Sequence, residues 1–178
     1  MAEGKTDFSG EERAVARERR RLVEAVDREL EDRFGPVKGP EPLDPLSGLI
    51  ATILSQNTSD RNSLRAFRDL RRAFPTWERA LEEGEGAIEE AIRVGGLSAI
   101  KARRIHAILE SLQERGDLSL NALQGQKMEA VRKALGAYPG VGPKTVACVL
   151  LFHMGREAFP VDTHVHRVTR RLGLIPPK

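Results

Sequence analysis

The chain has 178 residues and a formal net charge of +3, with 40% apolar, 31% charged and 4% aromatic residues. This length and apolar share allow a folded core and exclude a wholly disordered chain. The single cysteine, Cys148, excludes an intrachain disulfide framework, a zinc finger and a self-contained four-cysteine iron–sulfur site. The scarcity of aromatic residues argues against a broad platform on which single-stranded bases stack.

The charge is distributed unevenly along the chain. Residues 121–178 hold nine Lys or Arg against three Asp or Glu, whereas the first 120 residues hold a small excess of acids. A basic end of this kind indicates either a polyanion partner at that end or an ordinary solvated surface.

The first residues and the hydropathy of the chain indicate in which compartment the protein is expected. The first four residues contain no apolar stretch of the secretory type, and no run reaches the roughly 18 apolar residues that cross a bilayer. Low cysteine usage fits a reducing compartment. We therefore expect a protein of the cytoplasm, with the nucleoid as its place of action and no membrane association.

The first two predicted helices differ in character. Apolar residues recur with a period near 3.6 over residues 11–34, which predicts an amphipathic helix that ends at Gly35-Pro36. A Pro- and Gly-rich linker follows, up to residue 43. Asp44 is then the expected cap of a helix over about 46–55, and this helix is apolar almost all round, which predicts a central, buried position.

The remaining segments also favour helices, and no stretch alternates with the period of two that a strand requires. The expected helices are one capped by Asp60, a short one opened by Pro75-Thr76, one over 85–94, one capped by Ser98 that ends near Gly116, one over 127–136, one over 143–154, and a last one from Asp162-Thr163 to Gly173. We predict an all-α protein of eight to ten short helices.

The segment LGAYPGVGPKT, residues 135–145, carries the clearest functional signal. Gly140 and Gly142, spaced by one residue, allow a turn to approach a flat or charged object closely because no Cβ intervenes. The turn leads into a helix whose first N–H groups lack partners within the helix, and these groups with the helix dipole suit a phosphate. The alternative is an ordinary glycine turn between two helices.

Lys144 lies in the first turn of that second helix, where the helix dipole disfavours a positive charge. Two interpretations stay open at this point. The dipole favours the free amine, which is the nucleophilic form of a lysine. Alternatively, the ammonium contacts a phosphate that docks at the same helix end.

Asp162 also has two interpretations. It precedes a helix, and aspartate is a preferred N-cap. An ionised carboxylate held there also stabilises a sugar cation that develops nearby. His164 and His166 lie on different faces of the helix with no third ligand near them, so we expect no metal site. Arg167, Arg170 and Arg171 form a basic face suited to phosphates, with a solvated surface as the alternative for Arg170 and Arg171.

Four motifs together resemble the endonuclease III-like DNA glycosylases of the helix–hairpin–helix (HhH-GPD) superfamily. They are ILSQNTSDRN (53–62), GGLSAIKARRI (95–105), LGAYPGVGPKTVACVLLF (135–152) and FPVDTHVHRVTRRLGL (159–174). The resemblance covers about residues 20–178 and implies a two-lobed helical bundle. In that fold residues 1–43 contribute a helix and linker to the second lobe, residues 44–158 form a six-helix lobe, and residues 159–178 begin the rest of the second lobe.

The resemblance implies a base-excision-repair enzyme that removes damaged, in particular oxidised, pyrimidines from duplex DNA and then cuts the strand by β-elimination. The target nucleotide is flipped out of the stack to reach the enzyme. By position, Lys144 matches the nucleophile that forms a Schiff base with the sugar. Asp162 matches the catalytic carboxylate. Family members that only remove the base usually lack this lysine, so Lys144 implies the combined glycosylase and lyase activity.

The resemblance also implies a set of DNA-binding residues. Gln56 or Asn57 fills the gap that the flipped base leaves. Leu97 is a wedge beside it or, alternatively, a core leucine. The remaining expected contacts lie on the segment laid against the minor groove, on the hairpin and on the last helix: Lys101, Gly140, Val141, Gly142, Thr145, His164 and Arg167.

One departure concerns the end of the chain. The family normally continues into a four-cysteine [4Fe–4S] region, which this sequence does not contain, and Cys148 falls at an apolar helical position typical of a core. We therefore expect a truncated form of a longer protein, no cofactor in this chain, and a monomer that binds double-stranded DNA containing a damaged base or an abasic site. The alternatives are a DNA-binding module without catalysis, or a glycosylase for uracil or thymine in mismatches or for oxidised guanine.

Overall fold

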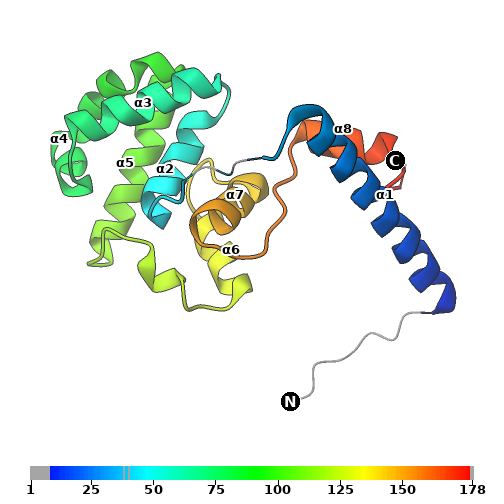
Figure 1. The fold of residues 1–178 in the computed structure, drawn as a ribbon. Coiled ribbons are helices and arrows are strands. Elements are labelled where there is room, and N and C mark those ends of the chain that lie inside the picture. The colour runs from blue at the N-terminus through cyan, green and yellow to red at the C-terminus, as the bar shows by residue number, and fades with distance from the viewer. Residues whose placement is uncertain (1–8, 38, 40, 177–178) are drawn as a thin grey trace. The chain divides into compact units, whose positions relative to one another are not determined.

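A computed structural model describes residues 9–37, 39 and 41–176 (Figure 1). Residues 1–8, whose first four contain no apolar stretch of the secretory type, lie outside these ranges, as do residues 38, 40, 177 and 178. Over the described ranges the chain forms α-helices and short 3-10 helices and no strand, which confirms the all-α prediction. The elements are α1 (Gly10–Phe34), α2 (Pro45–Ser55), α3 (Asp60–Ala73), α4 (Trp77–Ala91), η1 (Arg93–Gly95), α5 (Ser98–Glu114), η2 (Asn121–Leu123), α6 (Met128–Gly136), α7 (Pro143–His153) and α8 (Thr163–Arg171).

The chain divides into two compact units. One is formed by the described residues within 40–164, and the other by those within 1–39 together with those within 165–178. The predicted divisions after residues 43 and 158 lie a few residues from these. Among the described residues every buried side chain belongs to the unit of residues 40–164, whereas α1 and α8 contain none. None of the described helices is both long and apolar enough to cross a bilayer.

The buried helix α2 is the centre of the larger unit, as its apolar composition predicts. Asp44 caps it, because its Oδ1 accepts a hydrogen bond from the Ser47 N–H at 3.0 Å. The helix packs against α3, α5 and α7. Gly48 lets α7 come close, since a Cβ at that position would lie 2.2 Å from the His153 ring. The Nδ1 atom of His153 in turn accepts a hydrogen bond from the Leu43 N–H, 3.3 Å away.

Two predicted helix caps are wrong by one residue. Ser59 rather than Asp60 caps α3, because Ser59 has the extended backbone of a cap and its Oγ accepts from the Asn62 N–H at 3.4 Å. Asp60 is instead the first helical residue, where a carboxylate also suits the helix dipole. Ser98 lies inside α5 and donates its hydroxyl proton to Glu89, so Leu97 occupies the cap position without a side-chain bond.

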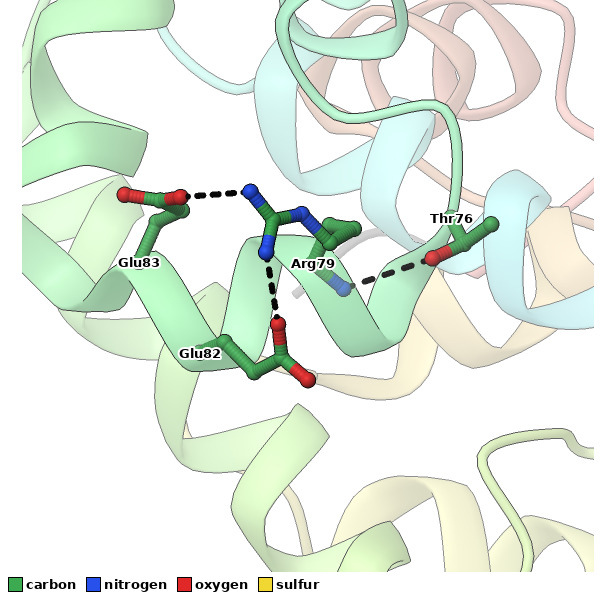
Figure 2. A network of polar contacts seen from close by, with 4 residues as sticks. All are labelled: Thr76, Arg79, Glu82 and Glu83. Atoms are coloured by element: carbon green, nitrogen blue, oxygen red, sulfur yellow. Dashed lines mark hydrogen bonds and ion pairs between the residues drawn. The ribbon is translucent and has the colours of Figure 1, made fainter.

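The helix α4 replaces two predicted helices. Its backbone breaks inside the helix at Gly84, where φ is 83° and ψ is 178°, so the two predicted segments join across a kink. Figure 2 shows the first segment, in which Thr76 accepts from the Arg79 N–H and the Arg79 guanidinium bonds Glu82 and Glu83 at 3.0 and 2.9 Å. These ion pairs are exposed, so they add little stability.

Candidate functional site

The hairpin joins α6 to α7 through a turn built on two glycines. Gly140 has a φ of +76°, a conformation that glycine adopts without steric cost. Gly142 has extended backbone and occupies the cap position of α7, where it supplies no capping side chain. Val141, between them, is buried, and its N–H donates to the Tyr138 carbonyl at 3.2 Å. The Val141 side chain therefore anchors the turn in the core, and the DNA contact expected of Val141 stays a prediction.

Gln56 ties the end of α2 to this hairpin. Its Nε2 donates to the Gly140 carbonyl at 3.1 Å and to Thr145 Oγ1 at 3.2 Å. Its Oε1 accepts from Arg104 Nη1 at 3.0 Å. The structure thus brings Gln56, Gly140 and Thr145 together, although 84 residues separate the first two in sequence.

Arg104, on α5, is a member of this cluster that the sequence did not single out. Its side chain lies over Gly140 so closely that a Cβ there would be 2.5 Å from Arg104 Nε. This contact places a guanidinium beside the turn that precedes α7. The one signal for it is the run of basic residues in GGLSAIKARRI, which does not say which of them faces the hairpin.

The structure separates the two candidates for the gap-filling residue. Gln56 is half-buried and its amide is engaged in three hydrogen bonds. Asn57 is exposed and has a φ of 52°, in the left-handed region. Gln56 is thus held by the hairpin and by Arg104, whereas Asn57 lies exposed on a turn, and which of the two fills the gap stays a prediction.

Leu97 is 51% exposed and has a φ of 50°. The alternative that it is a core leucine is therefore wrong. A left-handed conformation is sterically unfavourable for a residue of this size, and such positions cluster at functional sites.

Lys101, which is expected to contact DNA, is instead buried. Its side chain is only 1% exposed, and Nζ donates to the Leu54 carbonyl at 2.8 Å and to the Gly95 carbonyl at 2.9 Å. Burial lowers the pKa of this lysine below its ordinary value. The expectation that Lys101 contacts DNA is wrong for this structure, because the amino group lies inside the fold and both carbonyls belong to backbone.

The reactive lysine predicted from the hairpin is accessible. Lys144 is exposed at the second position of α7, directly after Pro143. The next residue, Thr145, is buried and its Oγ1 accepts a hydrogen bond from Gln56, while the DNA contact expected of Thr145 stays a prediction. A buried Thr145 beside an exposed Lys144 fixes the orientation of this first helical turn.

The residues around the start of α8 are exposed as well. Asp162 directly precedes the helix and belongs, with Lys144 and His164, to the unit of residues 40–164. Arg167 belongs to the other unit. The two interpretations of Asp162, as a cap and as a catalytic carboxylate, both remain predictions.

The residues of this chain do not fit a four-cysteine iron–sulfur cluster. Cys148 is buried in α7 among core residues, at 6% exposure. In the part of the chain that the structure describes, no three His, Cys, Asp or Glu side chains gather as metal ligands would.

Comparisons with known proteins place the chain among DNA repair proteins. The model of the HhH-GPD superfamily of base excision DNA repair proteins matches residues 50–178. A relative from Arabidopsis thaliana is 48% identical over 132 residues, which are 74% of this chain and 45% of the relative. Endonuclease III of Sulfolobus acidocaldarius is 40% identical over 130 residues, 71% of this chain and 56% of the relative. The chain thus spans about half the length of these two curated relatives.

Solved structures agree with the sequence comparisons. A non-covalent endonuclease III–DNA complex and a trapped covalent endonuclease III–DNA intermediate match with TM-scores of 0.71 and 0.70. Each is 28% identical, and each alignment covers 89% of this chain and 70% of that chain. The fold, the hairpin and these matches agree: the chain belongs to the HhH-GPD superfamily of base excision DNA repair proteins, and it is endonuclease III-like.

Proposed function

We propose that this chain is the DNA-processing part of a glycosylase with abasic-site lyase activity on damaged, in particular oxidised, pyrimidines in duplex DNA. The observation that carries the proposal is the exposed Lys144 at the start of α7, next to a turn without capping side chains. A helix N-terminus suits a phosphate, so an exposed amine in its first turn is placed to reach the sugar of a nucleotide whose backbone docks there. The trapped covalent complex of the related endonuclease III supports a covalent mechanism.

The chemistry assigns each role to a residue. The free amine of Lys144 attacks the anomeric carbon of the flipped nucleotide, and the bond to the damaged base breaks with its electron pair leaving on the base. Opening of the sugar ring then gives a Schiff base between Lys144 and the sugar. Loss of a proton from the 2′ carbon expels the 3′ phosphate and cuts the strand. Asp162 accepts the proton that the Lys144 nitrogen releases as the new bond forms, and its negative charge stabilises the cationic sugar.

The DNA contacts divide into positioning and opening roles. The amides of the first turn of α7, after Gly142, bind a backbone phosphate, and Arg104 adds positive charge beside them. Asn57 fills the gap in the stack, and Leu97 wedges beside it. His164 and Arg167 add phosphate contacts around the start of α8.

The proposal is tested with a panel of duplexes, each carrying one abasic site, oxidised pyrimidine, uracil, mismatched thymine or oxidised guanine. We expect strand cleavage of the abasic duplex and excision of the oxidised pyrimidine, and loss of both in K144A. Salt-sensitive binding without cleavage of any duplex would instead identify a non-catalytic DNA-binding module. Preference for another duplex on the panel would reassign the substrate.

The role of Asp162 needs its own variant. Asn keeps the ability to cap a helix but removes the charge. We therefore expect D162N to keep its thermal stability and to lose base excision. An unchanged excision rate in D162N would leave capping as the whole role of this residue.

A further inference from the structure

Two exposed turns share an unusual backbone conformation. Asn57 and Leu97 are the only non-glycine residues with positive φ over the described ranges. A positive φ is unfavourable for a residue with a side chain, so the surrounding structure must hold both residues in this conformation. Asn57 follows the end of α2, and Leu97 follows η1 and precedes α5.

One buried amino group is bonded to the backbone just before each of these turns. Lys101 Nζ donates to the carbonyl of Leu54, three residues before Asn57, and to the carbonyl of Gly95, two residues before Leu97. The two distances are 2.8 and 2.9 Å, and the side chain is 1% exposed. The two turns therefore share a single anchor inside the fold.

The chemistry of the anchor explains why it is a lysine. Leu54 lies in the last turn of α2, where carbonyls lack partners within the helix and a cation is favoured. Burial lowers the pKa of Lys101, and an ammonium or an amine has enough N–H donors for both bonds. A methionine would fill the same volume without making these hydrogen bonds. Packing alone therefore does not explain the buried amino group of Lys101.

We propose that Lys101 is a positioning residue that sets the spacing between Asn57 and Leu97, so that both side chains enter the DNA duplex together at the flipped nucleotide. The inference rests on the proposed function, which gives Asn57 and Leu97 their roles in the duplex. Lys101 acts through these two residues and does not touch the DNA.

The experiment is a mutant cycle with K101M in two backgrounds. One background is the natural chain, and the other carries N57G and L97G, which remove both side chains at no cost to a left-handed backbone. Opening of the duplex is followed by the fluorescence of 2-aminopurine placed next to the damaged base, and excision by single-turnover rates. Each protein is measured below its melting transition. K127M, which removes an exposed lysine at the start of α6, serves as the control.

In the natural background we expect K101M to slow duplex opening and excision roughly 10- to 100-fold, because a small displacement of a positioned group has effects of this size. In the N57G/L97G background we expect K101M to change either rate by less than about threefold, since the residues it positions are gone. K127M should match the natural chain in both backgrounds. If K101M does not fold, K101R replaces it, since it keeps donors but moves them, and the same dependence on background is expected.

An equal loss of rate in both backgrounds would show that Lys101 is only a structural residue and would overturn the inference. The inference is also overturned if K101M lowers the melting temperature but leaves the rate of duplex opening unchanged. Failure of the proposed function has a different signature, because the natural chain would then not excise or cleave at all. If N57G/L97G opened the duplex as fast as the natural chain, Asn57 and Leu97 would have no role in duplex opening. That result would also overturn the inference.

Discussion

At the scale of single residues, the two glycines of the hairpin differ in what they require. Gly140 needs a positive φ and has Arg104 against its Cα, whereas Gly142 has extended backbone and open space around it. A side chain at Gly140 is therefore costly to the fold. A side chain at Gly142 affects only what approaches the turn from outside.

We expect G140A to lower the free energy of unfolding by about 1 to 3 kcal/mol, because a left-handed alanine is strained and its Cβ meets Arg104. G142A should change it by less than about 0.5 kcal/mol and still weaken DNA binding, since a methyl group keeps the phosphate from the amides. Urea denaturation and DNA titration measure the two effects. Equal stability of the two variants would contradict this account of the turn.

His153 makes stability depend on pH. Burial lowers the pKa of His153 below its ordinary value of 6.5, and the nearby Asp44 carboxylate partly opposes this shift. The neutral ring accepts the Leu43 N–H, so this stabilisation is fully present above pH 6.5 and is lost as the pH falls toward the lowered folded-state pKa. We expect the melting temperature to fall between pH 7 and pH 5, and to fall less in H153N, whose amide oxygen still accepts. An identical pH dependence in H153N would assign the effect to other groups.

At the scale of elements, the sequence predicts helices well and their ends less well. Asp44-Pro45 and the apolar residues after it locate α2, because capping and burial favour the same boundary. Ser59 and Asp60 both cap helices well, and only the backbone conformation decides between them. Lys101 lies in a basic stretch that is typical of an exposed surface, and its burial depends on the Leu54 carbonyl 47 residues away. The Gln56 contacts likewise depend on long-range packing that no local pattern contains.

The kink in α4 gives a prediction at this scale. Gly84 has a φ of +83°, whereas Gly86 lies in regular helix, and neither Cβ would meet an atom within 4 Å. G86A should raise the free energy of unfolding by about 0.4 to 1 kcal/mol, because alanine favours the helix and restricts the unfolded chain. G84A should lower it by about 1 kcal/mol or more, because alanine disfavours the left-handed region. Thermal unfolding compares the two, and stabilisation by both substitutions would show that the break at Gly84 is not required.

At the scale of the whole molecule, the buried side chains are divided unequally between the two units. All buried side chains in the described residues lie in the unit of residues 40–164, and this unit also holds the hairpin, Lys144 and Asp162. The amphipathic helix predicted at residues 11–34 forms, but none of its side chains is buried, and Val23 and Leu30 are 49% and 51% exposed. Its pattern predicts a face for packing and does not say what covers that face.

We expect I50A, in the core of α2, to lower the free energy of unfolding by about 2 to 5 kcal/mol. V23A, in α1, should change it by less than about 0.5 kcal/mol, because the side chain is half exposed. Denaturation curves of the two variants at equal protein concentration make the comparison. A large loss in V23A would mean that α1 is buried in solution.

The covalent role of Lys144 is the central claim, and one measurement addresses it directly. The protein is incubated with abasic duplex DNA and sodium borohydride, and the trapped complex is digested and mapped by mass spectrometry. The account predicts a reduced sugar adduct on Lys144 and no trapped complex with K144A, while K127M traps as the natural chain does. A trapped complex that persists in K144A, or an adduct on another lysine, would contradict it.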